Sequence, residues 1–289
     1  MKIFVAGATG VIGRALVPRL VHAGHQVVGL SNDESRNRLL LALGAEPVVV
    51  DVFDRDALTA TVQRARPDAL IDELTSLGKG DYVANNRIRK LGTRNLVDAA
   101  LAAGISRVVA QSYCLYAPGE GLAGEDDPLD LSSHADGSFE GILPLEQAVS
   151  EVASGVILRY GTLYGPGTAY APDGSVADQF RRGEFVPHDA VTSFVHVEDA
   201  AQAAVLALVW PKGTFNIVDD EPAPASVWGP VFAAAVGAPH TKLLAPATRR
   251  RGASNAKARR QLAWQPIYPS WRDGFKEFAS SNSDVRRSA

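Results

Sequence analysis

The chain has 289 residues but only one cysteine, Cys114, and no excess of charge of either sign. A lone cysteine cannot form an internal disulfide, so we expect a protein of the reducing cytoplasm. The formal net charge of -3 gives no electrostatic reason to expect nucleic acid or an anionic membrane as a partner. No apolar run approaches the ~20 residues that a membrane span needs. These absences leave a small-molecule substrate as the expected partner.

Metal-binding motifs are also missing from the sequence. The six histidines are scattered, and none has the paired cysteine or helical glutamate partner of a metal site. We therefore expect no metal ion at the functional site.

A regular alternation of short apolar runs and amphipathic stretches occupies residues 1–112. The alternation predicts a Rossmann-type α/β fold, a doubly wound parallel sheet with crossover helices. Two further strands are expected at 156–159 and 215–218. The first five strands are expected at 3–6, 26–30, 47–50, 69–71 and 107–110, and helices at 12–23, 91–103, 145–153 and 199–208.

The second half of the sequence is less regular, which suggests that the two halves have different functions. We predict a dinucleotide-binding core in residues 1–167, with contributions from about 190–218. Residues 168–289 are expected to form mainly a smaller C-terminal substrate lobe.

Glycines at positions 7, 10 and 13 follow the first expected strand and open the first expected helix. In this context Gly7 permits a tight turn, Gly10 leaves room for a pyrophosphate, and Gly13 lets the helix pack on the strand. Free N–H groups and the helix dipole then face the phosphates. We predict that a nicotinamide dinucleotide is held here by Gly7, Thr9, Gly10, Val11, Ile12 and Gly13.

The end of the second expected strand predicts which nicotinamide cofactor binds. An Asp or Glu there would hold the ribose hydroxyls of NAD, but the sequence has Ser31 and Asn32. These residues and the guanidinium of Arg36 suit a 2′-phosphate, so NADP(H) is favoured over NAD(H). After the third strand, Asp51 and Val52 are expected beside the adenine, with Asp51 also able to cap a turn.

Several segments together resemble the short-chain dehydrogenase/reductase superfamily, in its extended, epimerase/dehydratase-like branch. The resemblance covers nearly the whole chain and implies a Rossmann sheet of about seven strands with a C-terminal substrate lobe. The matching segments are Gly7–Gly13, Asp51-Val52, Gly92–Val97, Leu158–Gly167, Phe194–Ala200 and Leu262–Pro266.

The resemblance also implies a catalytic trio, of which one member is present. It assigns a hydroxyl role to Ser112, four residues before Tyr116, followed by a Tyr-x-x-x-Lys pair on the next long helix. When Glu146 is aligned with the acidic residue that usually follows the Lys, Ser138 and Ile142 stand where Tyr and Lys belong. None of the seven tyrosines is followed four residues later by lysine. The usual proton donor of the family is therefore missing.

In the family, the Lys lowers the pKa of the Tyr so that the phenol exchanges a proton with a substrate oxygen near neutral pH. Three outcomes stay open for this chain. Another acid substitutes, with Tyr116, Tyr164, Tyr113 and His196 as candidates; the reaction needs no proton donor; or the chain binds a dinucleotide without turnover.

The main hypothesis is an NAD(P)-dependent oxidoreductase or epimerase-like enzyme acting on a small organic carbonyl or alcohol. Ser112 would orient the substrate oxygen, and Tyr116 or Tyr164 would supply the proton. The alternative is a dinucleotide-binding protein without redox turnover, or the same fold reused for lyase, isomerase or cyclase chemistry. The resemblance further suggests a homodimer.

Other charged residues have two interpretations each. Arg159 contacts cofactor or substrate, or it satisfies loop carbonyls. The run Arg249–Arg251 binds a substrate phosphate or forms a solvated face. Asp199 is expected to cap its helix, and His196 to have a structural role.

Overall fold

The computed structural model describes residues 1–77, 80–131, 139–186, 190–239 and 251–278, which form two compact units. The chain passes between the units several times, so each is assembled from separate stretches of sequence. The first unit comprises Met1–Tyr113, Leu131–Arg159 and Ala200–Phe215, and the second comprises Cys114–Asp130, Tyr160–Asp199 and Asn216–Ala289. The assignment of cofactor to residues 1–167 and of substrate to residues 168–289 stays a prediction.

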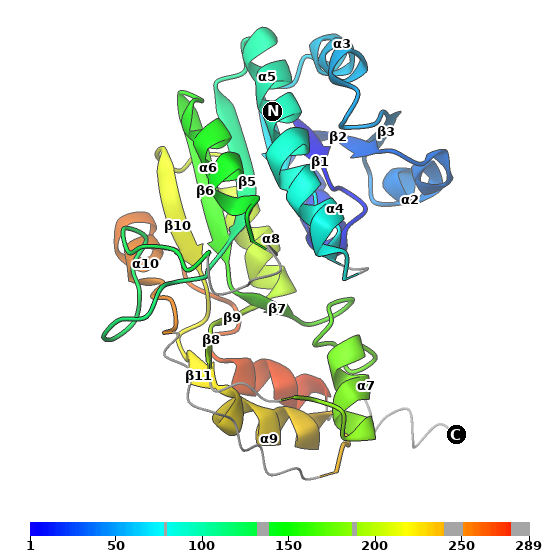
Figure 1. Ribbon diagram of the computed structural model, residues 1–289. Helices are drawn as coiled ribbons and strands as arrows, with labels where there is room; N and C mark the ends of the chain where they lie inside the picture. The colour runs from blue at the N-terminus through cyan, green and yellow to red at the C-terminus, as the bar shows by residue number, and fades with distance from the viewer. Residues whose placement is uncertain (78–79, 132–138, 187–189, 240–250, 279–289) are drawn as a thin grey trace. The chain divides into compact units, whose positions relative to one another are not determined.

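A seven-stranded sheet carries the first unit, in the order β10-β6-β5-β4-β1-β2-β3 (Figure 1). The pairs β1–β2, β1–β4, β2–β3 and β4–β5 are parallel. The order turns at β1, so the carboxyl ends of β1 and β4 flank the point where open α/β sheets bind ligands. All seven expected strands are confirmed. They are β1 Lys2–Ala6, β2 Gln26–Ser31, β3 Glu46–Val49, β4 Ala69–Asp72, β5 Arg107–Tyr113, β6 Ser154–Tyr160 and β10 Gly213–Ile217.

Helices α3, α5 and α6 bury their apolar stripes in one core with the strands. Leu58, Leu96 and Val149, one from each helix, are fully buried. Figure 1 shows α5 and α6 running alongside the strands. The Rossmann-type fold predicted from the sequence is therefore confirmed. The helical elements of this part of the chain are α1 Val11–His22, η1 Glu34–Arg36, α2 Asn37–Ala42, α3 Arg55–Ala65, α4 Tyr82–Arg87, η3 Ile88–Gly92, α5 Thr93–Ala102, α6 Ile142–Ser150 and α8 Val197–Leu206.

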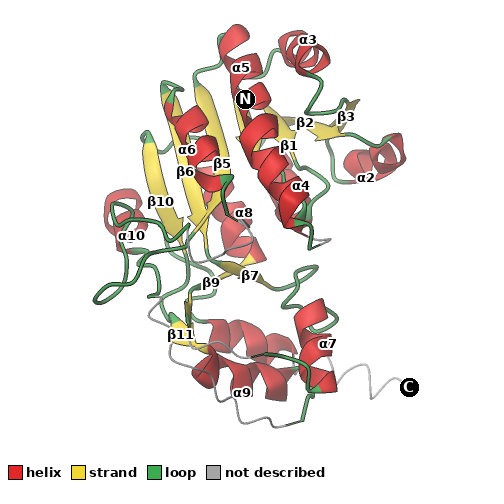
Figure 2. Ribbon diagram, viewed as in Figure 1, coloured by secondary structure: helices red, strands yellow, loops and turns green. Residues whose placement is uncertain are grey.

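The second unit is built around an aromatic cluster. Figure 2 shows its helices α7 and α9 in red. Trp228 and Phe232 of α9 pack with Trp271, Phe275 and Phe194, and all five are buried. None of the helices among the described residues is both long and apolar enough to cross a membrane. The elements are β7 Thr162–Tyr164, α7 Ser175–Arg182, β8 Val191–Thr192, β9 Phe194–His196, β11 Ala223–Pro224, α9 Ala225–Ala235 and α10 Ala256–Leu262.

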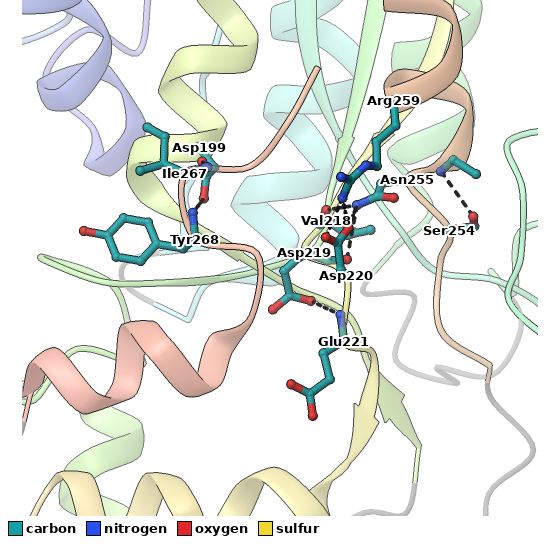
Figure 3. Close-up of polar contacts among 11 residues, drawn as sticks. Asp199, Val218, Asp219, Asp220, Glu221, Ser254, Asn255, Arg259, Ile267 and Tyr268 are labelled. Atoms are coloured by element: carbon teal, nitrogen blue, oxygen red, sulfur yellow. Dashed lines mark hydrogen bonds and ion pairs between the residues drawn. The ribbon is translucent and has the colours of Figure 1, made fainter. Parts of the chain in front are cut away.

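Buried carboxylates tie the loops of the second unit together (Figure 3). Asp199 accepts hydrogen bonds from the backbone N–H groups of Ile267 and Tyr268. The prediction that Asp199 caps its helix is wrong, because α8 begins two residues earlier, at Val197. The residue lies within the first turn and uses its carboxylate for a distant loop.

Asp219 has the same role a short distance along the chain (Figure 3). Its carboxylate accepts from the N–H groups of Glu221 at 3.2 Å and Trp271 at 2.8 Å. Burial raises the pKa of Asp219 to about 8. Its neighbour Asp220 instead pairs with Arg259 at the surface.

Candidate functional site

The glycine turn after β1 has a backbone shape that a larger residue would break. Gly7 has φ +85°, and a Cβ there would lie 2.5 Å from the carbonyl oxygen of Glu73. A Cβ at Gly13 would lie 2.2 Å from the carbonyl oxygen of Gly7. Both contacts are with backbone atoms, so two of the three glycines are required by the protein's own packing.

Gly10 differs, because the protein itself leaves space beside it. A Cβ at Gly10 would meet only the carbonyl oxygen of Gly7, at 3.1 Å, and Gly10 is exposed. Helix α1 starts here with no side-chain cap and no acidic residue in its first turn. Open space beside uncapped N–H groups at a helix start fits the pyrophosphate of a dinucleotide. Thr9 and Val11 flank the space half-buried, whereas Ile12 is buried.

The segment after β2, where the adenosine ribose of the cofactor is expected, contains one cationic and one anionic side chain. Ser31 is buried, and its hydroxyl donates to the carbonyl of Asp33, 3.1 Å away. Asn32 and Arg36 are exposed, and Arg36 Nε lies 3.8 Å from the carboxylate of Asp33. Hydrogen bonds from Ser35 hold the pKa of Asp33 below its usual value. A cation and an anion are therefore both available here.

Asp51 caps the turn that follows β3. Its carboxylate accepts from the N–H of Phe53 at 2.9 Å, and the residue is exposed. Val52 is buried, and its carbonyl accepts from the Asn95 side chain at 3.0 Å. The capping role expected for Asp51 is present, and its contact with adenine stays a prediction.

Ser112 belongs to a buried polar network. Its hydroxyl donates to Glu146 Oε1 at 2.7 Å. The same carboxylate is held by Arg159, with Nε 2.8 Å from Oε1 and one terminal nitrogen 2.7 Å from Oε2. All three residues are more than nine-tenths buried. Arg159, whose two interpretations were open, is thus an ion-pair partner that links β6 to α6 and, through Glu146, to β5.

The start of α6 carries an apolar residue where the family's lysine belongs. Ile142 is the first residue of α6 and is fully buried. Ser138, which stands at the tyrosine position, lies outside the described residues. Ile142 has no proton to exchange and no charge, so this position cannot activate a phenol.

The two tyrosines predicted as proton donors are both buried within the second unit. The Tyr116 hydroxyl donates to Asn216 Oδ1 at 2.5 Å. Tyr164 packs among aromatic rings, and its hydroxyl is buried without a hydrogen-bond partner. Burial raises the pKa of Tyr164 well above its usual value, which makes it a weak acid. Their catalytic role stays a prediction.

His196 and Arg251 bind their own chain. His196 Nδ1 lies 3.2 Å from the backbone N–H of Glu198, and its ring packs on Tyr268. Arg251 pairs with Asp127 at 2.6 Å and donates to the carbonyl of Ala117. Arg249 and Arg250 lie outside the described residues.

Two charged residues at the carboxyl edge of the sheet, Asp72 and Arg89, were not predicted from the sequence. Asp72 ends β4, and its carboxylate accepts from the Thr93 hydroxyl at 2.7 Å. A polar residue directly after an expected strand was the available signal for Asp72. Arg89 gave none, because it stands in the run Arg87–Lys90, which reads as a solvated helix face.

The sheet and the glycine turn define a dinucleotide-binding α/β protein. The chain belongs to the NAD dependent epimerase/dehydratase family, which matches residues 3–217. The expected branch of the short-chain superfamily is thereby confirmed. The protein is an NAD(P)-dependent enzyme of the oxidoreductase and epimerase type, as the main hypothesis predicted.

Two relatives and one solved structure are similar over most of their length. The 3-diazoavenalumate denitrifying reductase of a Streptomyces sp is 42% identical, with 95% of this chain and 99% of the relative covered. The 2-alkyl-3-oxoalkanoate reductase of Stenotrophomonas maltophilia is 28% identical, with 83% and 77% covered. UDP-glucose 4-epimerase of Thermus thermophilus, in complex with NAD, superposes with a TM-score of 0.77 at 24% identity, covering 97% of this chain and 98% of that one.

Proposed function

We propose that this enzyme reduces an aromatic diazo compound and releases its nitrogen as N2. The observation that carries the proposal is the replacement of the family's proton-donating pair, with a buried, uncharged Ile142 at the lysine position. The similarity to a denitrifying reductase of a diazo compound, over nearly the whole of both chains, supports the same chemistry.

The direction of the hydrogen bond that the Ser112 hydroxyl donates supports this proposal. A hydroxyl has one proton, and that of Ser112 is donated to Glu146. Towards a substrate, Ser112 therefore presents only lone pairs and can accept a hydrogen bond but not donate one. Reduction of a carbonyl needs a donor at the substrate oxygen, whereas loss of N2 needs none. Ser112 remains our proposed substrate contact, in the role of an acceptor.

The overall balance of the proposed reaction requires no acid. The reduced nicotinamide supplies one hydride, and an arenediazonium group leaves as N2 with the electron pair of its C–N bond, so that Ar–N2⁺ and H⁻ give Ar–H and N2. The role of the chain is to hold the cofactor at the glycine turn and to position the aromatic carbon. The buried Glu146–Arg159 pair keeps β5, β6 and α6 in a fixed arrangement for this purpose.

We further propose that NADP(H) is the preferred cofactor. Arg36 is half-exposed beside the end of β2, where a guanidinium can bind a 2′-phosphate with two hydrogen bonds. Gly10 and the uncapped start of α1 would hold the pyrophosphate, and Asp51 would lie at the adenine. The carboxylate of Asp33 would serve the ribose hydroxyls if NAD were bound instead.

We propose that the enzyme forms a homodimer. Exposed apolar side chains lie on neighbouring elements of the first unit, namely Val83 on α4, Leu91 on η3 and Leu143 on α6, 80%, 52% and 45% exposed. Such a surface favours burial against a second copy. Light scattering of the purified enzyme measures whether it is a dimer.

We also propose a cytoplasmic location, because the single cysteine of the chain suits a reducing compartment.

Deuterium labelling tests the reaction directly. We expect 4-carboxybenzenediazonium and NADPH deuterated at C4 to give benzoate with one deuterium at the former C–N carbon, with N2 released in equal amount. The same reaction with unlabelled NADPH in D2O should give no deuterium there. A reaction without enzyme measures the uncatalysed background. Failure to exceed it would contradict the proposal.

The second candidate is reduction of a carbonyl, as in the 2-alkyl-3-oxoalkanoate reductase relative. The same assay with a 2-alkyl-3-oxo acid separates the two. Oxidation of NADPH with this acid but not with the diazonium salt would favour the carbonyl reaction. Ser112 would then have to release its bond to Glu146 to donate to the substrate.

A further inference from the structure

Arg89 is a buried cation whose Nε has no hydrogen-bond acceptor among the residues that the structure describes. Arg89 is 2% exposed, and its Nε is buried without a hydrogen-bond partner. Within the described part of the chain, no hydrogen bond or ion pair involves its guanidinium. Burial lowers the pKa of Arg89 to about 10, so the side chain stays charged at neutral pH. A buried charge left without partners is costly, so a buried donor without an acceptor points to a partner such as a ligand, an ion or a water.

The carboxylates near Arg89 are already engaged. Tyr113, Asp72 and Glu146 interact with Arg89 electrostatically. However, Asp72 accepts from Thr93 and from the N–H of Leu74, and Glu146 accepts from Ser112 and Arg159. These carboxylates lower the cost of burying the cation without forming bonds to it. The Nε–H of Arg89 thus remains available to an incoming acceptor.

The backbone holds Arg89 in this place by an unusual turn. Helices α4 and α5 are continuous except for η3, a π-helical turn that contains Arg89. Such π turns inside α-helices are rare and occur often at functional sites. A Cβ at Gly141 would lie 2.7 Å from the Cβ of Arg89. Since Gly141 directly precedes Ile142, the Cβ of Arg89, which comes from another helix, lies close to the start of α6, where the missing lysine would stand.

We propose that Arg89 binds an anionic oxygen of the substrate, a carboxylate or a phenolate carried by the aromatic ring. The proposal rests on the proposed function for the nature of that ring. The site lies at the carboxyl edge of β4 and β5, where ligands of doubly wound sheets bind. Arg89 supplies two parallel N–H donors to a planar anion. It would thereby select charged aromatic substrates and orient them against the cofactor.

Binding of an unreactive anion tests Arg89 without any turnover. Calorimetric titration of the enzyme saturated with NADP⁺ would compare benzoate with benzamide, which has the same shape and no charge. We expect Arg89→Gln to weaken benzoate binding by about 10- to 100-fold and to leave benzamide binding unchanged. Arg89→Lys should retain part of the benzoate affinity.

Lys90→Gln is the matched control, because Lys90 is the next residue of η3 and pairs with Glu140 at the surface. It should leave benzoate binding unchanged. A structural role for Arg89 makes the opposite prediction, a fall in the stability of Arg89→Gln without ligand, measured by urea unfolding. Absence of benzoate binding to the wild-type complex, or equal binding to Arg89→Gln, would overturn the proposal. Because the titration involves no hydride transfer, it can succeed even if the diazo reaction is not observed.

Discussion

Two parts of the first unit, the glycine turn after β1 and the start of α6, have diverged from the family to different degrees. The turn keeps Gly7 and Gly13 because their absent side chains would strike backbone atoms 2.5 and 2.2 Å away. At the start of α6, a buried Ile142 stands where the resemblance places the lysine of the family. The comparison teaches that the shape of the glycine turn is fixed by the path of the chain, whereas the side chains of a proton-donating pair can be replaced.

The largest expected effect comes from placing a charge in the open space of the turn. Gly10→Asp would put a carboxylate against the pyrophosphate, and two like charges at about 4 Å repel by about 4 kcal/mol near a protein surface. We expect NADPH affinity to fall at least about 100-fold, measured by fluorescence titration. Gly10→Ala, with only one contact at 3.1 Å, is the control and should bind within a few-fold of wild type. Equal losses in both variants would show that the space is needed for folding instead.

The second prediction concerns the buried pair behind Ser112. Glu146→Ala removes the carboxylate that pairs with the buried Arg159 guanidinium, which should lower the free energy of unfolding by about 3 to 5 kcal/mol. Glu151→Ala is the control, because Glu151 follows the same helix and pairs with the more exposed Arg94. The control should lose less than about 1 kcal/mol. Urea unfolding measures both, and similar losses would contradict a structural role for the pair.

The third prediction concerns Asp72, at the end of β4, and the way its protonation makes the stability of the protein depend on pH. Burial raises its pKa from 3.8 to about 6, so the folded state binds this proton more tightly than the unfolded chain. The resulting stabilisation is present below pH 3.8 and is lost as the pH rises through 6. Relative to wild type, Asp72→Asn should therefore gain stability between pH 4 and 7, by on the order of 3 kcal/mol. A difference that does not change with pH would contradict this.

A smaller effect is expected for cofactor choice. Arg36→Ala should lower kcat/KM for NADPH by about tenfold, the value of a charge-assisted bond to phosphate, and leave NADH unchanged. Arg38→Ala, on the following helix α2, is the control for a general loss of positive charge. If NADH is the better cofactor of the wild-type enzyme, the preference for NADP(H) is wrong.

The smallest expected effect distinguishes the roles of Ser112. Ser112→Ala removes one hydrogen bond to Glu146 and should cost about 1 kcal/mol of stability. If the reaction draws no proton from the enzyme, turnover of the diazonium salt should stay within a few-fold of wild type. A loss of turnover by several hundred-fold with unchanged stability would restore Ser112 as a hydroxyl donor.

Much of this arrangement could be predicted from the sequence. The seven strands follow from short apolar runs, because strands buried on both faces need continuous apolar residues. The glycine spacing after β1 predicted the shape of the turn. Since no tyrosine is followed four residues later by lysine, residue identity alone indicated that the family's usual proton donor is missing.

Other features could not be predicted, because they depend on residues far apart in the sequence. The bond between Ser112 and Glu146 joins residues 34 positions apart, and it decides which way the serine proton points. Asp199 reads as a helix cap from its neighbours alone. Only the loop at Ile267 and Tyr268, brought to it by the fold, gives its carboxylate another partner.

The sequence by itself determined the fold, the glycine turn after β1 and the loss of the family's catalytic pair, because these depend on local spacing and on residue identity. The tertiary structure decided how these residues are held: the hydrogen bond from Ser112 to Glu146, the burial of Tyr116 and Tyr164, and the burial of Arg89 near the start of α6. These are properties of partners and of burial. They arise only when helices and strands that are distant in the chain pack against each other.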